Sequence, residues 1–334
     1  MTHNRQVMIF GEIVEGKLSA VTKELLGCGR ILSNELGEEL SAVFIGNEIS
    51  HPASEAIAFG ADKVYVVDDP LVKDYQTDSY LLSMTKIFEK EMPQIFIFGQ
   101  TSIGIDLAPR LAFKLNTTIV LDCVELSIDP DTKLLLRTKP VFGGKAMATF
   151  FSEFYPQLAT VRPNSMPPLG RDNSRSGKVI TIDADLDPLL IRTKVLGKVT
   201  EKIEGIKLED AEVIISGGRG IGGAEGFKQL KEMVKTMKGA AVGATRSACD
   251  AGWVPTTMQI GLTGKIVTPN LYVAVALSGA SQHMAGCSGS KTIVAINKDP
   301  EANIFKEAQF GVIGDWGIVL PPFIRKIEEL LKSN

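Results

Sequence analysis

The sequence predicts an α/β protein of two domains, each built on a parallel sheet. The chain has 334 residues, which is enough for two average domains. Short apolar runs alternate with helix-like segments through its first third, and a second series of this kind begins near residue 206. We therefore expect an N-terminal domain over residues 1–205 and a C-terminal domain over residues 206–334.

The N-terminal segments alternate between strand-like and helix-like patterns. The expected strands cover residues 6–13, 40–46, 62–69 and 94–100, and the expected helices cover residues 18–36, 52–60, 78–92 and 104–115. In the first of these helices, apolar residues from Val21 to Leu36 recur at a spacing of three or four. Nearly continuous apolar strands that alternate with helices are typical of a parallel sheet covered by helices.

Four strand-like segments then follow one another without a helix between them. They cover residues 117–126, 133–142, 145–153 and 157–163. This succession predicts an antiparallel extension of the first sheet. Residues 163–178 are rich in Pro, Ser, Gly and Asn, and are expected to form a surface loop.

The C-terminal half returns to the alternating pattern. Its expected strands cover residues 211–217, 239–246, 264–269, 271–279, 292–298 and 310–315. The first strand leads into a helix that is expected to end at Lys238. Pro321 and the Ile/Leu spacing after it predict a terminal helix.

Composition narrows the classes of protein to which the chain could belong. Hydrophobic residues make up 44% and charged residues 22%, which is ordinary for a globular protein. The net charge is −3 and the pI is near 5.8, with no block of Lys and Arg, so we expect no nucleic-acid partner. No apolar run approaches the ~18–20 residues of a membrane span. The N-terminus has no secretory or transit pattern, so we expect a cytoplasmic protein.

The four cysteines do not indicate a metal centre. Cys28, Cys123, Cys249 and Cys287 are scattered, with no C-x-x-C pair. Zinc, iron–sulfur ligation and a disulfide framework are therefore not expected.

Polar or glycine-rich segments follow most of the expected C-terminal strands. They contain Arg219, Thr245–Ser247, Thr263, Ser278–His283, Asn297 and Asp315. In open α/β sheets, ligands bind beyond the carboxyl ends of the strands, where small residues let the backbone approach and amide groups can hold phosphate. Together these segments predict a site for a large polar cofactor with phosphates, sugars and a heteroaromatic ring.

Other interpretations of these segments remain open at this point. Gly218, Gly220 and Gly223 fit G-x-G-x-x-G only loosely, and a tight turn with a solvated Arg219 is an alternative interpretation. A nicotinamide dehydrogenase would carry its fingerprint in the first βα turn, where no such glycine pattern occurs. No G-x-S-x-G elbow supports a hydrolase that would use His283. A nucleotide-binding module without redox activity is a further alternative.

Several motifs together resemble one known family. Residues 271–305 read LYVAVALSGASQHMAGCSGSKTIVAINKDPEANIF, and SGGRG (216–220), VGATR (242–246) and ATVRP (159–163) occur in the same chain. In identity and order, these elements resemble the electron transfer flavoprotein alpha subunit. The resemblance extends over the whole chain.

The resemblance implies a cofactor, a fold and partners. It implies FAD, held mainly by a Rossmann-like C-terminal domain, and a heterodimer in which the N-terminal domain packs on a beta subunit. It implies an electron carrier rather than an enzyme with its own substrate turnover. An acyl-CoA dehydrogenase or similar flavoenzyme is the implied partner, and ferredoxin or a quinone reductase is also compatible with the family.

The resemblance also implies residue roles. Arg219 would lie near the diphosphate, Thr245 or Ser247 at the phosphate–ribityl region, and Arg246 against the isoalloxazine ring. Thr263 would reach flavin N5, Gln282 would lie beside the flavin, and His283 would donate a hydrogen bond near O2. Asn297 and Asp315 would hold the adenosine end. The complete expected set is Arg219, Thr245, Arg246, Ser247, Ile260, Gly261, Leu262, Thr263, Ser278, Gly279, Ala280, Ser281, Gln282, His283, Asn297, Asp315 and Trp316.

Two positions depart from the family, and one segment favours a subtype. Leu262 stands where the family commonly has Gln, and Ser281 where a branched apolar residue is common. The segment VRPNSMPP (161–168), the loop after it and the chain length resemble the bifurcating type of anaerobes. The alternative is a plain shuttle from acyl-CoA dehydrogenases to a membrane quinone reductase.

Overall fold

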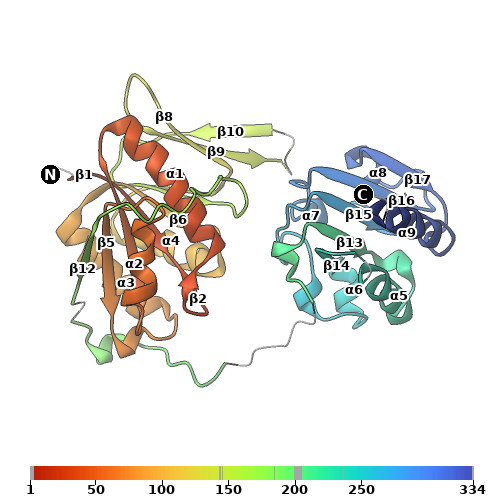
Figure 1. Cartoon of the computed structure of the whole chain (residues 1–334), viewed down its shortest axis with the longest axis horizontal. Helices are drawn as coiled ribbons and strands as arrows, with labels where there is room; N and C mark the ends of the chain where they lie inside the picture. The colour runs from red at the N-terminus through yellow and green to blue at the C-terminus, as the bar shows by residue number, and fades with distance from the viewer. Residues whose placement is uncertain are drawn as a thin grey trace. The chain divides into compact units, whose positions relative to one another are not determined.

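The computed structural model describes residues 4–142, 144, 146–183, 185–198, 205–235 and 237–332. The chain divides into two compact units: residues 1–141 with 145–199, and residues 142–144 with 200–334 (Figure 1). The expected change of domain at residue 205 adjoins residues 199–204, which lie outside the described residues.

A fully parallel sheet of seven strands forms the centre of the first unit. Its strand order is β12-β5-β4-β1-β6-β11-β7. The strands are β1 (Asn4–Gly11), β4 (Glu39–Gly46), β5 (Lys63–Asp68), β6 (Pro93–Gly99), β7 (Ile119–Cys123), β11 (Gln157–Val161) and β12 (Lys178–Thr181). The parallel sheet that the alternating pattern predicted is therefore present.

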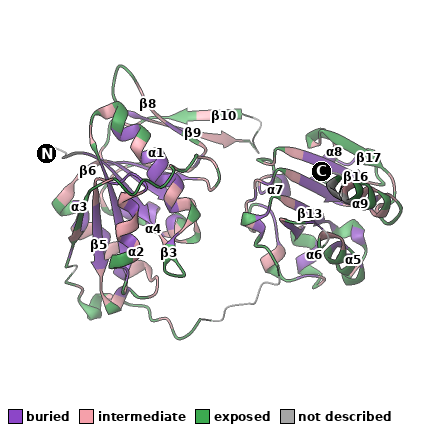
Figure 2. Ribbon diagram, in the orientation of Figure 1, coloured by how far each residue is buried: buried purple, intermediate pink, exposed green. Residues whose placement is uncertain are grey.

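Helices cover both faces of this sheet because its strands are apolar on both sides. The helices are α1 (Ala20–Leu36), α2 (Ser50–Ser54), α3 (Thr77–Glu91) and α4 (Ser102–Lys114). Val7 and Ile9 of β1 belong to a core shared with α1 and α2, whereas Met8 and Phe10 face a second core shared with α3 and α4. Figure 2 shows the buried strands between helices whose outer surfaces are exposed.

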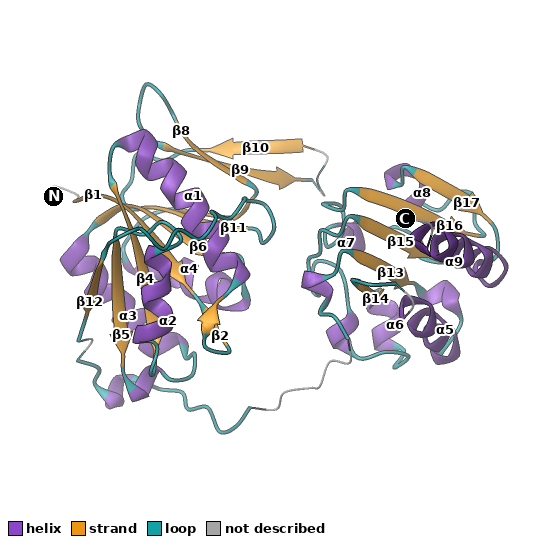
Figure 3. Cartoon of the chain, viewed as in Figure 1, coloured by secondary structure: helices purple, strands orange, loops and turns teal. Residues whose placement is uncertain are grey.

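The block expected to be antiparallel divides between two sheets. The strands β8 (Glu125–Ile128), β9 (Leu135–Val141) and β10 (Ala146–Phe150) form a separate antiparallel sheet (Figure 3). In contrast, β7 and β11 join the main sheet in parallel, which differs from the expectation. All five residues of β11 are buried, as in an interior strand covered on both faces. The remaining strands of this unit, β2 (Ile13–Val14) and β3 (Lys17–Leu18), form a small hairpin.

The second unit contains a parallel sheet of five strands in the order β14-β13-β15-β16-β17. The strands are β13 (Val213–Gly217), β14 (Ala240–Ala244), β15 (Leu271–Val275), β16 (Thr292–Asn297) and β17 (Phe310–Ile313). The helices are α5 (Ala224–Lys235), α6 (Arg246–Asp250), α7 (Ser281–Met284), α8 (Ile304–Glu307) and α9 (Trp316–Lys332).

Three sequence expectations for this unit need correction. Residues 264–269 form no named strand: the amide of Lys265 bonds to the carbonyl of Gln259, so the chain turns back on itself instead of continuing a ladder. The helix α5 ends at Lys235 rather than Lys238, and α9 begins at Trp316 rather than at Pro321.

The strand order places a switch point between β13 and β15. From β13 the chain continues to β14 on one side, and from β15 it continues to β16 on the other. The connections therefore diverge above two neighbouring strands, and this divergence opens a crevice at their carboxyl ends.

Candidate functional site

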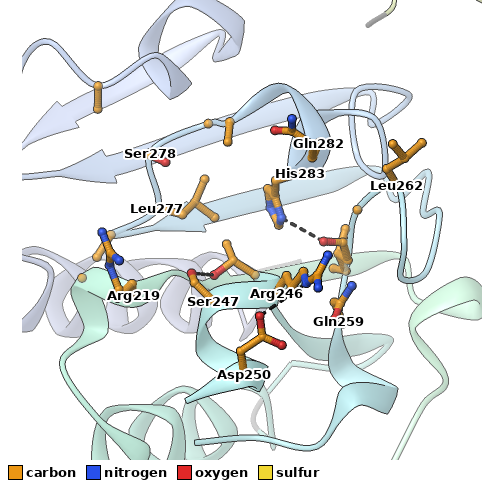
Figure 4. A pocket seen from close by; sticks show the side chains of 18 of the residues that line it. Arg219, Arg246, Ser247, Asp250, Gln259, Leu262, Leu277, Ser278, Gln282 and His283 are labelled. Atoms are coloured by element: carbon orange, nitrogen blue, oxygen red, sulfur yellow. Dashed lines mark hydrogen bonds and ion pairs between the residues drawn. The ribbon is translucent and has the colours of Figure 1, made fainter. Parts of the chain in front are cut away.

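A pocket of about 770 Å³ lies at this switch point, within the second unit (Figure 4). This volume is in the usual range for small-molecule and cofactor sites. Every residue of the expected cofactor-binding set lines the pocket except Ser281, Asp315 and Trp316. The structure therefore brings together segments that are separated by up to about eighty residues in the sequence, from Arg219 to Asn297.

Arg219 reaches the pocket from the turn after β13. The glycines on either side of it let this turn lie directly against the end of β15. The amide of Gly220 donates to the carbonyl of Ala276 at 3.1 Å, and a Cβ on Gly218 would lie 2.5 Å from the same oxygen. Arg219 is exposed and makes no ion pair with any described residue, so its guanidinium donors can bind a ligand.

The turn after β14 supplies two hydroxyls and a second cation. The hydroxyl oxygens of Thr245 and Ser247 lie 3.0 Å apart. The Nε of Arg246 is 3.3 Å from Oδ2 of Asp250, and both side chains are largely exposed. An exposed pair of this kind is weak, so it leaves the Arg246 guanidinium able to interact with a ligand.

The loop of residues 259–263 places a hydroxyl donor in the pocket. The side-chain amide of Gln259 donates to Oγ1 of Thr263 at 2.9 Å, so the hydroxyl hydrogen of Thr263 remains available for an acceptor in the pocket. The amide of Leu262 donates to the carbonyl of Gln282 at 2.7 Å. Gly261 has a φ of 141°, and a Cβ there would lie 2.8 Å from that carbonyl oxygen. Only glycine fits this close approach.

His283 lies in α7 with both ring nitrogens bonded inside the protein. Nδ1 is 3.0 Å from the carbonyl oxygen of Ile260, and Nε2 is 2.8 Å from the hydroxyl of Tyr272. Because a carbonyl can only accept, Nδ1 carries the proton. Burial lowers the pKa of His283 to about 4, so the ring is neutral near pH 7 and Nε2 accepts from Tyr272. The family resemblance implied that His283 donates a hydrogen bond to the flavin. In this structure the N–H of His283 is instead bonded to the carbonyl of Ile260.

The segment after β15 is shaped by Asn297. Its Nδ2 donates to the carbonyl of Leu277 at 2.9 Å, which fixes the turn that leads to α7. Gly279 has a φ of 75°, and a Cβ there would lie 2.4 Å from the amide nitrogen of Ile304. The side-chain amide of Asn297 thus already has a structural role at the edge of the pocket.

Three expected residues are not among those that line this pocket. Asp315 follows β17, which is separated from β15 by β16. Its Oδ1 accepts from the amide of Gly317 at 2.8 Å, at the start of α9. Trp316 packs against the apolar core under the sheet, and the exposed Ser281 hydroxyl contacts the Gln282 side chain.

Sequence reasoning missed several pocket residues. They are Asp250, Gln259, Ala276, Leu277, Asp299 and Ala302. Gly220, which was noted only for its glycine spacing, lines the pocket as well. Asp250 could have been found from its position four residues after Arg246 on one helix face. Gln259 carried no pattern of its own, because its role depends on the turn that brings Thr263 back to it.

No other chemistry stands out in the described part of the chain. It contains no group of three or more His, Cys, Asp or Glu residues that could hold a metal ion. The four cysteines are buried and free, and burial raises the pKa of Cys28, Cys123 and Cys287 to about 12. Such thiols are poor nucleophiles. No described helix has both the length and the apolar character needed to cross a membrane.

Comparisons with known proteins agree with the fold and with the pocket. Residues 7–187 match the model of the electron transfer flavoprotein domain, and residues 207–288 match that of the electron transfer flavoprotein FAD-binding domain. An electron transfer flavoprotein subunit alpha of Thermoanaerobacterium thermosaccharolyticum is 45% identical over 99% of this chain and 100% of its own length.

The chain belongs to the electron transfer flavoprotein alpha subunit family.

Two further relatives extend the comparison. The alpha subunit of Bacillus subtilis is 42% identical over 98% of each chain. The acryloyl-CoA reductase electron transfer subunit beta of Anaerotignum propionicum is 36% identical over 97% of this chain and 96% of its own. As an electron transfer flavoprotein alpha subunit, the chain binds FAD and transfers electrons in a heterodimer with a beta subunit.

The pocket suits FAD by its chemistry as well as by its family. Arg219 and Arg246 provide positive charge for a diphosphate and for a reducible ring, and glycine backbones allow close approach. Thr245, Ser247 and Thr263 add hydroxyls for the polar edge of a sugar or a ring.

Proposed function

We propose that the flavin ring lies between Arg246, Thr263 and α7, with the diphosphate toward Arg219 and the adenosine end toward Asn297. The observation that carries this orientation is the convergence of two arginines from separate strand ends on one pocket. Arg246 and Thr263 line the same pocket, and β14 is joined to the 259–263 loop by a bridge between Ala244 and Gln259.

The residues of this chain bind and tune the cofactor. Bound FAD supplies a ring that accepts and releases electrons. The positive charge of Arg246 and the free hydroxyl of Thr263 favour added negative charge on whatever ring they contact. A preference of about 1.4 kcal/mol for the reduced form corresponds to roughly 59 mV for one electron. His283 holds the 260–263 loop through the Ile260 carbonyl, so these donors stay in place.

We further propose that the heterodimer is of the bifurcating type, in which a second flavin on the beta subunit takes a hydride from NADH. The segment of residues 161–168 and the chain length favour this type over the plain shuttle. The name of the Anaerotignum relative supports an acyl-CoA-linked flavoenzyme as the partner.

An anaerobic NADH titration of the purified heterodimer, followed by visible absorbance, tests this proposal. Bleaching of two flavins supports the bifurcating type. One flavin that does not respond to NADH supports the plain shuttle from acyl-CoA dehydrogenases. A heterodimer that carries no flavin contradicts the assignment of the pocket itself.

A further inference from the structure

A buried arginine without a counter-ion lies in the first unit, in a different sheet from the flavin pocket. Arg137 is in β9, the central strand of the three-stranded antiparallel sheet (Figure 3). Its strand neighbours are Leu126 of β8 and Phe150 of β10. Only 1% of Arg137 is exposed, and it is among the largest fully buried side chains described.

The charge of Arg137 is not compensated within the described part of the chain. Nη1 donates to the carbonyl of Leu158 at 3.1 Å, and Nε has no hydrogen-bond partner. No described carboxylate forms an ion pair with it, and Asp122 is already held by Arg162 at 2.6 Å. A guanidinium remains charged at any physiological pH, so burying it alone is unfavourable unless an anion completes the site.

Arg137 lines a pocket that opens at the edge of the seven-stranded sheet. The pocket has a volume of about 510 Å³, and its other walls are residues 118–120, which run into β7, and residues 150–154 after β10. β7 is the last strand in the sheet order. An edge strand of this kind is normally covered by another element or by a partner.

The rim of this pocket is aromatic. Phe151 is 67% exposed, Phe154 is 64% exposed and Phe150 is 42% exposed. Neighbouring exposed phenyl rings are typical of protein interfaces rather than of a free surface. A small anion could neutralise Arg137 but would leave these rings in water, whereas a protein surface would cover both.

We propose that this pocket receives an Asp or Glu side chain of the beta subunit, flanked by apolar side chains that cover the phenylalanine rim. The carboxylate forms an ion pair with the guanidinium of Arg137, and the phenylalanine rim strengthens this pair by excluding water. This inference uses the heterodimer of the proposed function and adds the anchor of its interface. It is independent of the flavin pocket and of the direction of electron flow.

Dilution-induced dissociation of the heterodimer tests the anchor. Arg137→Met removes the charge with little change in length, and the subunit Kd should rise at least tenfold because the partner carboxylate then loses its pair. Arg137→Lys keeps the positive charge, so it should raise the subunit Kd by less than Arg137→Met. Arg110→Met, which removes an exposed arginine on α4, is the matched control and should stay within twofold of the parent.

Two checks separate a lost contact from a lost fold. At high protein concentration, the Arg137→Met heterodimer should keep the circular dichroism and the FAD content of the parent. An unchanged Kd in a folded Arg137→Met heterodimer would overturn the proposal, and so would loss of the fold itself, because the arginine would then be structural.

Photo-crosslinking locates the partner group directly. p-Benzoylphenylalanine at position 151 should form an adduct with a beta-subunit peptide that contains Asp or Glu. The same group at position 179, on the opposite edge strand β12, should not. Adducts confined to the alpha chain, or equal yields from both positions, would contradict the inference. A crosslinked heterodimer without flavin would refute the proposed function and leave this interface standing.

Discussion

At the scale of single residues, His283 connects the flavin pocket with the core of the second unit. Tyr272 is fully buried, and its hydroxyl donates to Nε2 of the imidazole, whose Nδ1 donates to the Ile260 carbonyl and thereby holds it. The histidine thus holds the 260–263 loop in place through a buried hydrogen bond to the Ile260 carbonyl. A neutral ring in this position adds no charge to the pocket, where the positively charged side chains among the lining residues are Arg219 and Arg246.

The neutral state of His283 predicts a dependence of stability on pH. Its folded pKa of about 4 is below the usual 6.5, so the unfolded chain binds a proton first as the pH falls. Stability from this group is complete above pH 6.5 and is lost as the pH falls toward 4, by up to about 3 kcal/mol. Fluorescence-detected unfolding, to which Trp253 and Trp316 contribute, measures the effect.

Two variants control this prediction. His283→Gln should flatten the loss between pH 6.5 and 4, whereas His51→Gln, which changes a histidine on α2, should leave it intact. An identical acid slope in His283→Gln would show that the ring is not held neutral by burial.

Most of the pocket-lining residues could be predicted from the sequence, but most of their contacts could not. Strand ends and family motifs located Arg219, Arg246 and Thr263. The bond from Tyr272 to His283 spans eleven residues and depends on how α7 packs under β15, which no local pattern encodes. The sequence shows Leu262 where the family commonly has Gln. It does not show that another glutamine, Gln259, donates its side-chain amide to Thr263.

At the scale of elements, Glu24 ties α1 to the loop after β11. Its side chain is buried, and one carboxylate oxygen, Oε2, has no hydrogen-bond partner in the described part of the chain, while the nearby backbone of Asn164, Ser165 and Met166 acts to lower its pKa. Desolvation outweighs this effect and raises the pKa of Glu24 to about 7. The proline-rich loop is therefore anchored by a group that titrates near neutral pH.

This anchor predicts a pH dependence of the opposite sign. Because the folded pKa of Glu24 is above its usual 4.5, its contribution is complete below pH 4.5 and is lost as the pH rises through 7. Glu24→Gln should reduce the fall in melting temperature between pH 5 and pH 8, by the equivalent of about 1–3 kcal/mol. Glu35→Gln, which changes an exposed residue on the same helix, should leave this fall in melting temperature unchanged. Parallel melting curves for Glu24→Gln and the parent would contradict the assignment.

The presence of a strand was easier to predict from the sequence than the neighbours of that strand in the sheet. The apolar run of β11 was visible, but its place between β6 and β7 depends on non-local pairing. Asp315 was expected in the pocket because it follows a strand, yet β17 is two strands away from the switch point. Only the strand order shows which strand ends adjoin the pocket described here.

At the scale of the whole molecule, the two units have separate cores, and residues 191–198 of the first unit lie just before the last change of unit, between residues 199 and 200. Residues 191–198 have no regular structure, and most are exposed. Limited trypsin digestion of the heterodimer should therefore cut first after Lys194 or Lys198. The flavin should remain with the C-terminal fragment, as measured by mass and visible absorbance. First cuts inside residues 205–332, or flavin on the N-terminal fragment, would contradict this domain division.

In the proposed orientation of FAD, Arg246 places its positive charge against the reducible ring. Anaerobic spectroelectrochemical titration of the Arg246→Ala heterodimer tests it most directly, with Arg246→Lys as the charge-retaining control. We expect Arg246→Ala to keep FAD but to lower its first one-electron potential by roughly 60 mV or more, and the lysine variant to recover most of this loss. An FAD-loaded Arg246→Ala protein with the potential of the parent would contradict the claim.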